Sequence, residues 1–289
     1  MLSSSSWPLR SITSTNFATF HRLGVVGRKS VALVGNKSRT SHRACVIQRN
    51  AENSPERNLT MEEVRRQKRE LRKEIRASLK HLSDNEITAQ SHQVWERLFA
   101  LPQYQKARSV GLFMSMNVGE IQTDYALKQV LRDKKALFVP RVGLDFELYD
   151  MDLVLVDTRD FSEESGDFYS KWPRNKWGIP EPPMECTSVA KRGDIDLLVV
   201  PGVAFDRLGS RLGQGKGYYD RFIASIRLGQ EEQHSVKPLL VAVGLTPQYL
   251  GDERVEHCQR TVPVSHHDFE MDLIITPTRT VVCKTPMEH

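Results

Sequence analysis

Runs of almost purely apolar residues constrain the fold of this chain more than any other feature. They are SVGLFM at 109–114, the centre of DIDLLVVPGVAFD at 194–206, LLVAVG at 239–244 and DLIITPT at 272–278. Such runs are typical of strands that are buried on both faces of a parallel sheet. ALFVPRV at 136–142 and the alternating segment DFELYDM at 145–151 predict two further strands.

Helical patterns alternate with these strands. Capping boxes at Thr60–Glu63 and Ser83–Glu86 predict the starts of two helices. Helices are expected from these boxes to about Leu79 and Phe99, and over 124–133 and 218–228, whereas 157–192 is expected to be a loop. This alternation predicts an α/β fold: a three-layer α/β/α sandwich with a mostly parallel central sheet.

The first 51 residues differ in composition from the rest. Eight basic residues precede the first acidic residue, Glu52, and the segment is rich in serine. This composition is typical of an organellar transit peptide, whereas a secretory signal contains a continuous apolar block. We expect residues 1–50 to be a disordered transit peptide, cleaved between about residues 40 and 55. Its expected destination is the mitochondrion, with the plastid as the alternative.

The remaining composition disfavours several classes of protein. The chain has 41 basic and 36 acidic residues, so without the eight leader cations the acids are in slight excess. A slightly acidic body does not favour a nucleic-acid partner. No apolar run of 18 residues predicts a membrane-spanning helix. The four cysteines have no paired spacing, so neither a disulfide framework nor a zinc knuckle is expected.

The segment GSRLGQGKGYYDRF, residues 209–222, lies between a predicted strand and a predicted helix. Its glycines match neither the Walker A spacing nor the dinucleotide-binding spacing. Glycines still allow a ligand to approach backbone N–H groups, and the helix start that follows favours an anion. With Arg211 and Lys216 as cations and Asp220 in the first helical turn, the segment predicts a phosphate site with a divalent cation. The simpler alternative is a flexible turn before a solvated helix.

The first predicted helix carries a lysine within its apolar stripe. Lys68 is in register with Val64, Leu71 and Ile75, and Arg72 follows one turn later. Lys68 either extends along the apolar face to reach solvent or points into a cleft that holds an anion. A solvated basic face is the simpler interpretation of this helix alone.

Several motifs together resemble one family. PGVAFDRLGSRLGQGKGYYDRF is similar to the signature of 5-formyltetrahydrofolate cyclo-ligases, also called methenyltetrahydrofolate synthetases. KRELRKEIR, FMSMNVGEIQT, FVPRV, WGIPEP and VPVSHHDFEMDLIITP occur in the family's order, so the resemblance covers residues 65–277. It implies a single cyclo-ligase domain over 58–283 with an α/β/α sandwich fold.

The resemblance also implies a reaction. Family members cyclise 5-formyltetrahydrofolate to 5,10-methenyltetrahydrofolate with ATP and Mg²⁺, and release ADP and phosphate. The γ-phosphoryl group of ATP would activate the formyl oxygen, and N10 of the same folate would then attack. The expected partners are these small molecules, and the expected state is a monomer.

Carried over to this sequence, the resemblance implies catalytic roles for Arg72, Arg211 and Lys216. The implied ATP-binding residues are Lys68, Arg69, Glu70, Leu71, Arg72, Arg211, Leu212, Gly213, Gln214, Gly215, Lys216, Gly217, Tyr218 and Tyr219. The implied folate-binding residues are Arg72, Met114, Glu120, Trp177, Gln214, Gly215, Lys216, Gly217 and Tyr218. Asp220 and Asp268 are the implied magnesium ligands. The match of Glu120 depends on a gap, because SMNVGEI is one residue longer than in some relatives.

Two other interpretations remain open. One is a noncatalytic folate- or nucleotide-binding protein on the same fold, and the other is a sugar-phosphate isomerase or CoA-transferase-like enzyme on a related α/β scaffold. The joint presence of Lys68, Arg72, Lys216, Asp220 and Asp268 favours the ligase, because a noncatalytic binder need not keep the whole set. Adjacent helical residues diverge by about 100°, so one of Tyr218 and Tyr219 is expected to pack inward.

Overall fold

The computed structural model describes residues 60–116, 119–142, 150–157, 168–227, 237–251 and 260–283. By its internal contacts the chain divides into Met1–Pro55 and Glu56–His289, and all described residues belong to the second unit. Its helices are α1 (Met61–Leu79), α2 (Asp84–Phe99), α3 (Pro102–Lys106), α4 (Asp124–Arg132) and α5 (Tyr218–Arg227), with a 3₁₀ turn η2 (Thr246–Gln248). Its strands are β1 (Ser109–Gly111), β2 (Ala136–Val142), β3 (Met151–Leu155), β4 (Leu197–Val200), β5 (Ala204–Phe205), β6 (Arg211–Leu212), β7 (Leu239–Val243), β8 (Leu273–Ile275) and β9 (Thr280–Val282). The proposed transit peptide at 1–50 lies outside the described residues.

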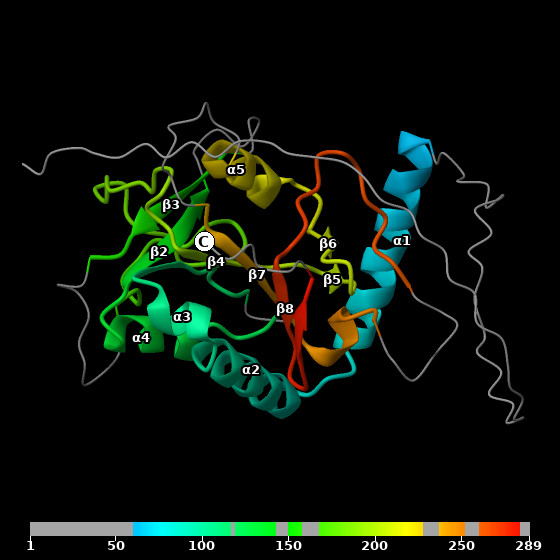
Figure 1. Ribbon diagram of the computed structural model, residues 1–289, viewed down its shortest axis with the longest axis horizontal. Coiled ribbons are helices and arrows are strands. Elements are labelled where there is room, and N and C mark those ends of the chain that lie inside the picture. Colours follow the sequence, from blue (N-terminus) through cyan, green and yellow to red (C-terminus); the bar gives the residue numbers. More distant parts are fainter. Residues whose placement is uncertain are drawn as a thin grey trace, which may run out of the picture. The chain divides into compact units, whose positions relative to one another are not determined.

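A mostly parallel sheet forms the centre of this unit (Figure 1). Its strand order is β3-β2-β1-β4-β7-β8-β9, and only the edge strands β3 and β9 run antiparallel to their neighbours. Central β1 pairs in parallel with both β2 and β4. The chain moves outward from β1 to one side and from β4 to the other, so the sheet has a topological switch point between these two strands.

Helices cover both faces of the sheet, which confirms the three-layer prediction. α5 lies on one face, and α2, α3 and α4 lie on the other (Figure 1). Alternate residues of each central strand face the two cores: Val199 packs with the α2–α4 side, and Leu198 packs with the α5 side. Leu71, Ile75 and Leu79 of α1 join the first core and bury the apolar stripe of that helix.

The two predicted capping boxes have different outcomes. At the start of α2, Ser83 and Glu86 form the complete reciprocal box. At the start of α1, Thr60 accepts a hydrogen bond from the Glu63 backbone N–H, but the Glu63 carboxylate bonds Arg66 and Gln67 instead of reaching back. A guanidinium one turn ahead is a stronger, charge-assisted partner than the backbone N–H of Thr60.

The prediction of one continuous strand over 194–206 was wrong. The run forms β4 and then breaks at Pro201 and Gly202 before the short strand β5. β5 pairs with β6 in a separate two-stranded sheet. Proline cannot donate to a sheet ladder, so the apolar run changes direction there. Similarly, the predicted strand at 109–114 ends at Gly111, although its apolar residues continue into the core.

The loop prediction is confirmed for the described residues 168–192. Strand-like pairing in this range takes the form of isolated bridges, such as the one between Arg174 and Pro180. Most of the strand predicted at 145–151 lies outside the described residues, and β3 begins at Met151. Within the described part of the chain, no helix is long and apolar enough to cross a membrane.

Asp206 anchors the turn between β5 and β6. Its side chain is fully buried, and its Oδ1 accepts hydrogen bonds from the backbone N–H groups of Leu208 and Ser210. Its Oδ2 accepts a third bond from the backbone N–H of Val262, at 2.9 Å. The carboxylate therefore joins the hairpin that leads into the glycine-rich segment to Val262, 56 residues further along the chain.

We predict that Asp206→Ala destabilises the protein by about 3 kcal/mol, because three backbone donors lose their acceptor. Urea denaturation of the full chain measures this change in the free energy of unfolding. Asp194→Ala is the matched control, since that carboxylate caps an exposed turn through a single bond to the Lys191 N–H. An equal decrease in the free energy of unfolding in the two variants would contradict this role of Asp206.

Candidate active site at the switch point of the sheet

The segments that leave β1 and β4 carry most of the predicted site residues. Ligands of open α/β sheets bind beyond the carboxyl ends of the strands, at the switch point. The segment after β1 includes Met114 and Glu120. The segment after β4 passes through the β5–β6 hairpin and the glycine loop, which we define as Gly213–Gly217, and then enters α5.

The glycine loop depends on residues without side chains. Gly215 and Gly217 have φ angles of +104° and +71°, a region that favours glycine. A Cβ atom on Gly213 would lie 2.8 Å from Nη1 of Arg211, so the guanidinium of Arg211 lies directly against the loop at Gly213. The positive φ angles of Gly215 and Gly217 thus set the path of the loop, and α5 begins directly after it, at Tyr218.

Arg211 is the buried cation of the site. It is 5% exposed, and its Nη2 donates to Oδ1 of Asp220 at 2.6 Å. Its Nη1 donates to the Pro201 carbonyl at the end of β4, at 3.3 Å. The buried Nε has no hydrogen-bond partner in the protein. Since buried polar groups are nearly always paired, this donor indicates a position for a polar ligand.

Tyr219 and Glu120 lie beside this arginine. The Tyr219 hydroxyl is buried and without a hydrogen-bond partner, and burial and the nearby Glu120 charge raise its pKa. Burial raises the pKa of the Glu120 carboxyl to about 7, although a hydrogen bond from the Met116 backbone N–H at 2.8 Å opposes this. The cluster of Glu120, Arg211 and Tyr219 is therefore enclosed, polar and only partly satisfied.

The two tyrosines diverge as expected from helical geometry. The ring of Tyr219 packs against both hydrophobic cores. Tyr218 instead lies near the guanidinium of Arg221, whose Cζ is 5.8 Å from the Tyr218 ring centroid. Tyr219 is thus the tyrosine that packs inward, and its hydroxyl reaches the buried polar cluster.

α1 lies alongside the glycine loop and Asp268. Lys68 Nζ bonds Oδ2 of Asp268 at 2.5 Å, and Arg72 Nε donates to the Gly213 carbonyl at 2.8 Å.

Burial and the neighbouring Arg76 lower the pKa of Arg72, while Asp268 opposes this shift. Burial alone would raise the pKa of Asp268, but bonds from Lys68 and Ser265 outweigh it and lower the pKa. Lys68 therefore points toward Asp268 rather than along the helix to solvent.

The remaining predicted residues occupy varied positions. Arg69 and Glu70 are exposed on α1, and Leu71 and Leu212 are buried in the core. Met114 is also a core residue, 5% exposed. Lys216 is exposed on the glycine loop, and Gln214 bonds Arg76.

Trp177 lies in a separate turn. It is 39% exposed, and its described partners, Asn175 and Lys176, lie in the same turn. Glu181 fastens this loop to the backbone N–H of Val142, at the carboxyl end of β2. Trp177 therefore belongs to a loop at the same edge of the sheet, but the structure does not bring its ring against the glycine loop.

Sequence reasoning missed two residues that complete the site. Arg76 donates from Nη2 to Oε1 of Gln214, and Ser265 bonds Asp268 through its backbone N–H and hydroxyl. Arg76 follows Arg72 by four residues, so helical periodicity was a usable signal for it. For Ser265, the signal was its position three residues before Asp268, which is typical of a polar turn.

The predicted magnesium ligands are the correct donor type for that ion, which usually takes one or two carboxylates together with phosphate oxygens and water. Asp220 uses Oδ1 to bind Arg211, and Asp268 uses Oδ2 for Lys68 and Ser265. These bonds use one oxygen of each carboxylate, so Oδ2 of Asp220 and Oδ1 of Asp268 take no part in them. Among the described residues, no three His, Cys, Asp or Glu side chains gather as a metal site.

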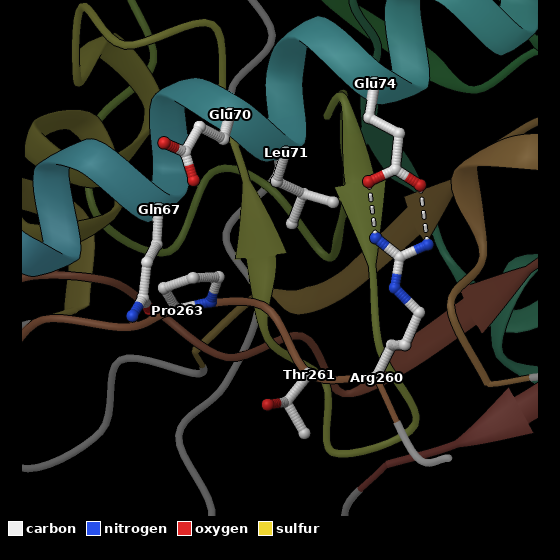
Figure 2. Close-up of a pocket in the computed structure, with 7 residues that line it drawn as sticks. All are labelled: Gln67, Glu70, Leu71, Glu74, Arg260, Thr261 and Pro263. Carbon is white, nitrogen blue, oxygen red and sulfur yellow. Dashed lines mark hydrogen bonds and ion pairs between the residues drawn. The ribbon is translucent and has the colours of Figure 1, made fainter. Parts of the chain in front are cut away.

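A pocket of about 250 Å³ lies on another side of α1 (Figure 2). It is lined by Gln67, Glu70, Leu71, Glu74, Arg260, Thr261 and Pro263. At one side of this pocket, the Arg260 guanidinium donates two hydrogen bonds of 2.7 Å to the Glu74 carboxylate. Of the implied ATP-binding residues, Glu70 and Leu71 line this pocket, whereas the cations Lys68, Arg72, Arg211 and Lys216 do not.

The fold and these contacts define an α/β protein with a glycine loop and a buried polar cluster at the switch point of its sheet. The chain belongs to the 5-formyltetrahydrofolate cyclo-ligase family, whose model matches residues 64–277. Membership makes it a ligase of folate metabolism, as the motifs predict.

Individual relatives cover most of the same region. A probable 5-formyltetrahydrofolate cyclo-ligase of Caenorhabditis elegans is 30% identical over 227 residues, which are 78% of this chain and 100% of the relative. The mitochondrial 5-formyltetrahydrofolate cyclo-ligase of Arabidopsis thaliana is 27% identical, over 76% of this chain and 78% of the relative. The solved 5,10-methenyltetrahydrofolate synthetase of Aquifex aeolicus has a TM-score of 0.57 and 27% identity, and covers 77% of this chain and 96% of its own.

We predict that Glu120→Gln changes how stability depends on pH. The Glu120 pKa is about 7 in the folded protein, against an ordinary 4.5, so the folded state retains this proton longer than the unfolded state. The wild type therefore loses stability relative to the variant as pH rises between these values, by up to roughly 3 kcal/mol. Chemical denaturation at pH 4.5, 6 and 8 measures the difference, and a gap independent of pH would contradict it.

Proposed function

We propose that this chain catalyses the ATP- and Mg²⁺-dependent cyclisation of 5-formyltetrahydrofolate to 5,10-methenyltetrahydrofolate, with release of ADP and phosphate. Residues 58–283 would form the catalytic domain and act as a monomer. Family membership supports the overall conversion.

The observation that carries this proposal is the unsatisfied polar cluster beneath the glycine loop. Arg211 Nε and the Tyr219 hydroxyl are buried without partners, next to a Glu120 carboxyl whose pKa is near 7. Leaving such groups unpaired costs free energy, and a polar ligand recovers that cost. Folate carries a polar heterocycle, and the adjacent loop has the geometry that suits phosphates, so the two substrates would meet here.

The reaction would proceed in two covalent steps. The formyl oxygen of the folate attacks the γ-phosphorus of ATP, the bond between that phosphorus and the β–γ bridging oxygen breaks, and ADP leaves. N10 then attacks the formyl carbon, loses its proton, and the carbon–oxygen bond breaks to release phosphate with the former formyl oxygen. Phosphoryl transfer depends mainly on positioning and charge neutralisation.

The protein residues would supply that neutralisation. Lys216 on the glycine loop and Arg72 beside it would contact the transferred phosphoryl group, and Arg211 would support the loop from below. Asp220 and Asp268 would hold Mg²⁺, which neutralises phosphate charge when bound. Met114, Glu120, Trp177 and Gln214–Tyr218 would contact the folate, and the remaining loop and α1 residues, including Lys68, would contact ATP.

We also propose that the leader directs the chain to the mitochondrion. The segment before Glu52 has eight basic residues and no acid, which is typical of a transit peptide. One relative, from Arabidopsis thaliana, is named as mitochondrial. Imaging of a fluorescent fusion of residues 1–55, with its arginines replaced as a control, tests this assignment.

We predict that the full chain forms the methenyl chromophore from 5-formyltetrahydrofolate only when ATP and Mg²⁺ are present. Lys216→Ala is expected to lower kcat/KM by at least about 100-fold, because a charge that faces the transferred phosphoryl group is lost. Absorbance at the methenyl band measures the rate.

Lys191→Ala is the control for that experiment, since Lys191 lies in an exposed turn before the amino end of β4. A wild-type rate in Lys216→Ala would refute the role of Lys216. Folate binding by the wild type without any chromophore would favour the noncatalytic alternative.

We predict that a chelator abolishes the activity and that added Mg²⁺ restores it. Asp220→Asn and Asp268→Asn are each expected to raise the Mg²⁺ concentration for half-maximal rate by about 10-fold, because a carboxylate ligand is lost. Ser265→Ala distinguishes the loss of a metal ligand from the loss of a hydrogen bond, because it removes a donor to Asp268 and keeps the carboxylate. An unchanged Mg²⁺ dependence in both Asp variants would exclude them as ligands.

A further inference from the structure

Three cations form a single row along α1. Lys68, Arg72 and Arg76 are spaced by four residues, so each lies one turn, about 6 Å, beyond the last on the same face. Each contacts the segments that face the helix: Lys68 contacts Asp268, Arg72 the Gly213 carbonyl, and Arg76 the Gln214 side chain. The row therefore lies beside the glycine loop.

The charge of Arg76 is not neutralised by its partners. Its bond is to the neutral amide of Gln214, and it is an exposed residue. Its neighbours on the helix surface, Arg72, Lys73 and Lys80, are all basic, and like charges at this spacing repel. Its charge also contributes to the lowered pKa of Arg72.

Arg66 on the same helix shows the contrasting arrangement. It is also exposed, but it lies between Glu63 and Glu70, with ion pairs of 2.6 and 2.8 Å. These carboxylates raise the pKa of Arg66. The helix therefore neutralises an arginine that faces solvent, whereas it concentrates positive charge where Arg76 faces the loop.

We propose that Arg76, the third cation of the α1 row, is a further nucleotide-binding residue, whose guanidinium Gln214 holds at the edge of the glycine loop, where it contacts phosphate oxygens of the bound nucleotide. This inference rests on the proposed function, because it requires that the loop binds a polyphosphate. A phosphate is favoured over another anion because the amide that holds Arg76 belongs to the loop whose shape suits phosphate groups. Gln214 would act as a positioning residue and Arg76 as a direct contact.

A purely structural role makes a different prediction. A cation in the last turn of a helix stabilises it through the helix dipole, and Arg76 is in the last turn of α1. In that case Arg76→Ala would lower the melting temperature of the protein and leave nucleotide affinity unchanged.

The test measures nucleotide binding directly, without turnover. Isothermal titration of the full chain with Mg²⁺ and an ATP analogue whose β–γ bridge cannot be hydrolysed gives the Kd. Loss of one charge-assisted contact is expected to weaken binding about 10-fold in Arg76→Ala. Arg76→Lys is expected to recover part of this loss, and Gln214→Ala to weaken binding by less. Arg66→Ala, the matched control, is expected to bind as the wild type does.

The outcomes separate this inference from the proposed function. If the wild type binds no nucleotide, the proposed function fails and this inference fails with it. If the wild type binds and Arg76→Ala binds equally well, only this inference is overturned. Steady-state kinetics add a second criterion: a raised KM for ATP with little change in kcat supports the contact, whereas a raised KM for the folate alone would assign Arg76 to the other substrate and overturn it.

Discussion

The buried ion pair between Arg211 and Asp220 is the interaction on which the site depends. Arg211 lies in β6 of the β5–β6 hairpin, Asp220 lies in the first turn of α5, and their 2.6 Å bond joins the two ends of the glycine loop. The same guanidinium bonds the Pro201 carbonyl at the end of β4. A Cβ atom on Gly213 would lie 2.8 Å from Nη1 of Arg211, so a side chain at this position would displace the guanidinium. The buried Arg211 side chain thus connects the end of β4 to the first turn of α5 and contacts the loop between them. Removing Asp220 would leave the buried charge of Arg211 uncompensated.

Much of the fold could be predicted from local patterns. Continuous apolar runs indicated β4, β7 and β8, and a complete capping box marked the start of α2. The β5–β6 hairpin could not be predicted, because its strands of two residues each have no periodicity to detect. The site was predictable in composition but not in its contacts. Lys68 and Asp268 are 200 residues apart in sequence, and only the folded sheet edge makes them neighbours.

The site therefore combines segments from four parts of the chain. α1 contributes a row of cations, and the segment after β1 contributes Glu120. The segment after β4 contributes Arg211, the glycine loop and Tyr219, and the segment before β8 contributes Ser265 and Asp268. Side chains of the site bind one another, as in the pairs Lys68–Asp268 and Arg211–Asp220.

We propose that this site places the γ-phosphoryl group of ATP against the formyl oxygen of the folate. The most direct measurement uses 5-formyltetrahydrofolate labelled with ¹⁸O in the formyl group and mass spectrometry of the inorganic phosphate after turnover. Transfer of the label into phosphate, in step with formation of ADP and the methenyl product, is the expected result. Unlabelled phosphate together with methenyl product would contradict direct phosphorylation of the formyl oxygen.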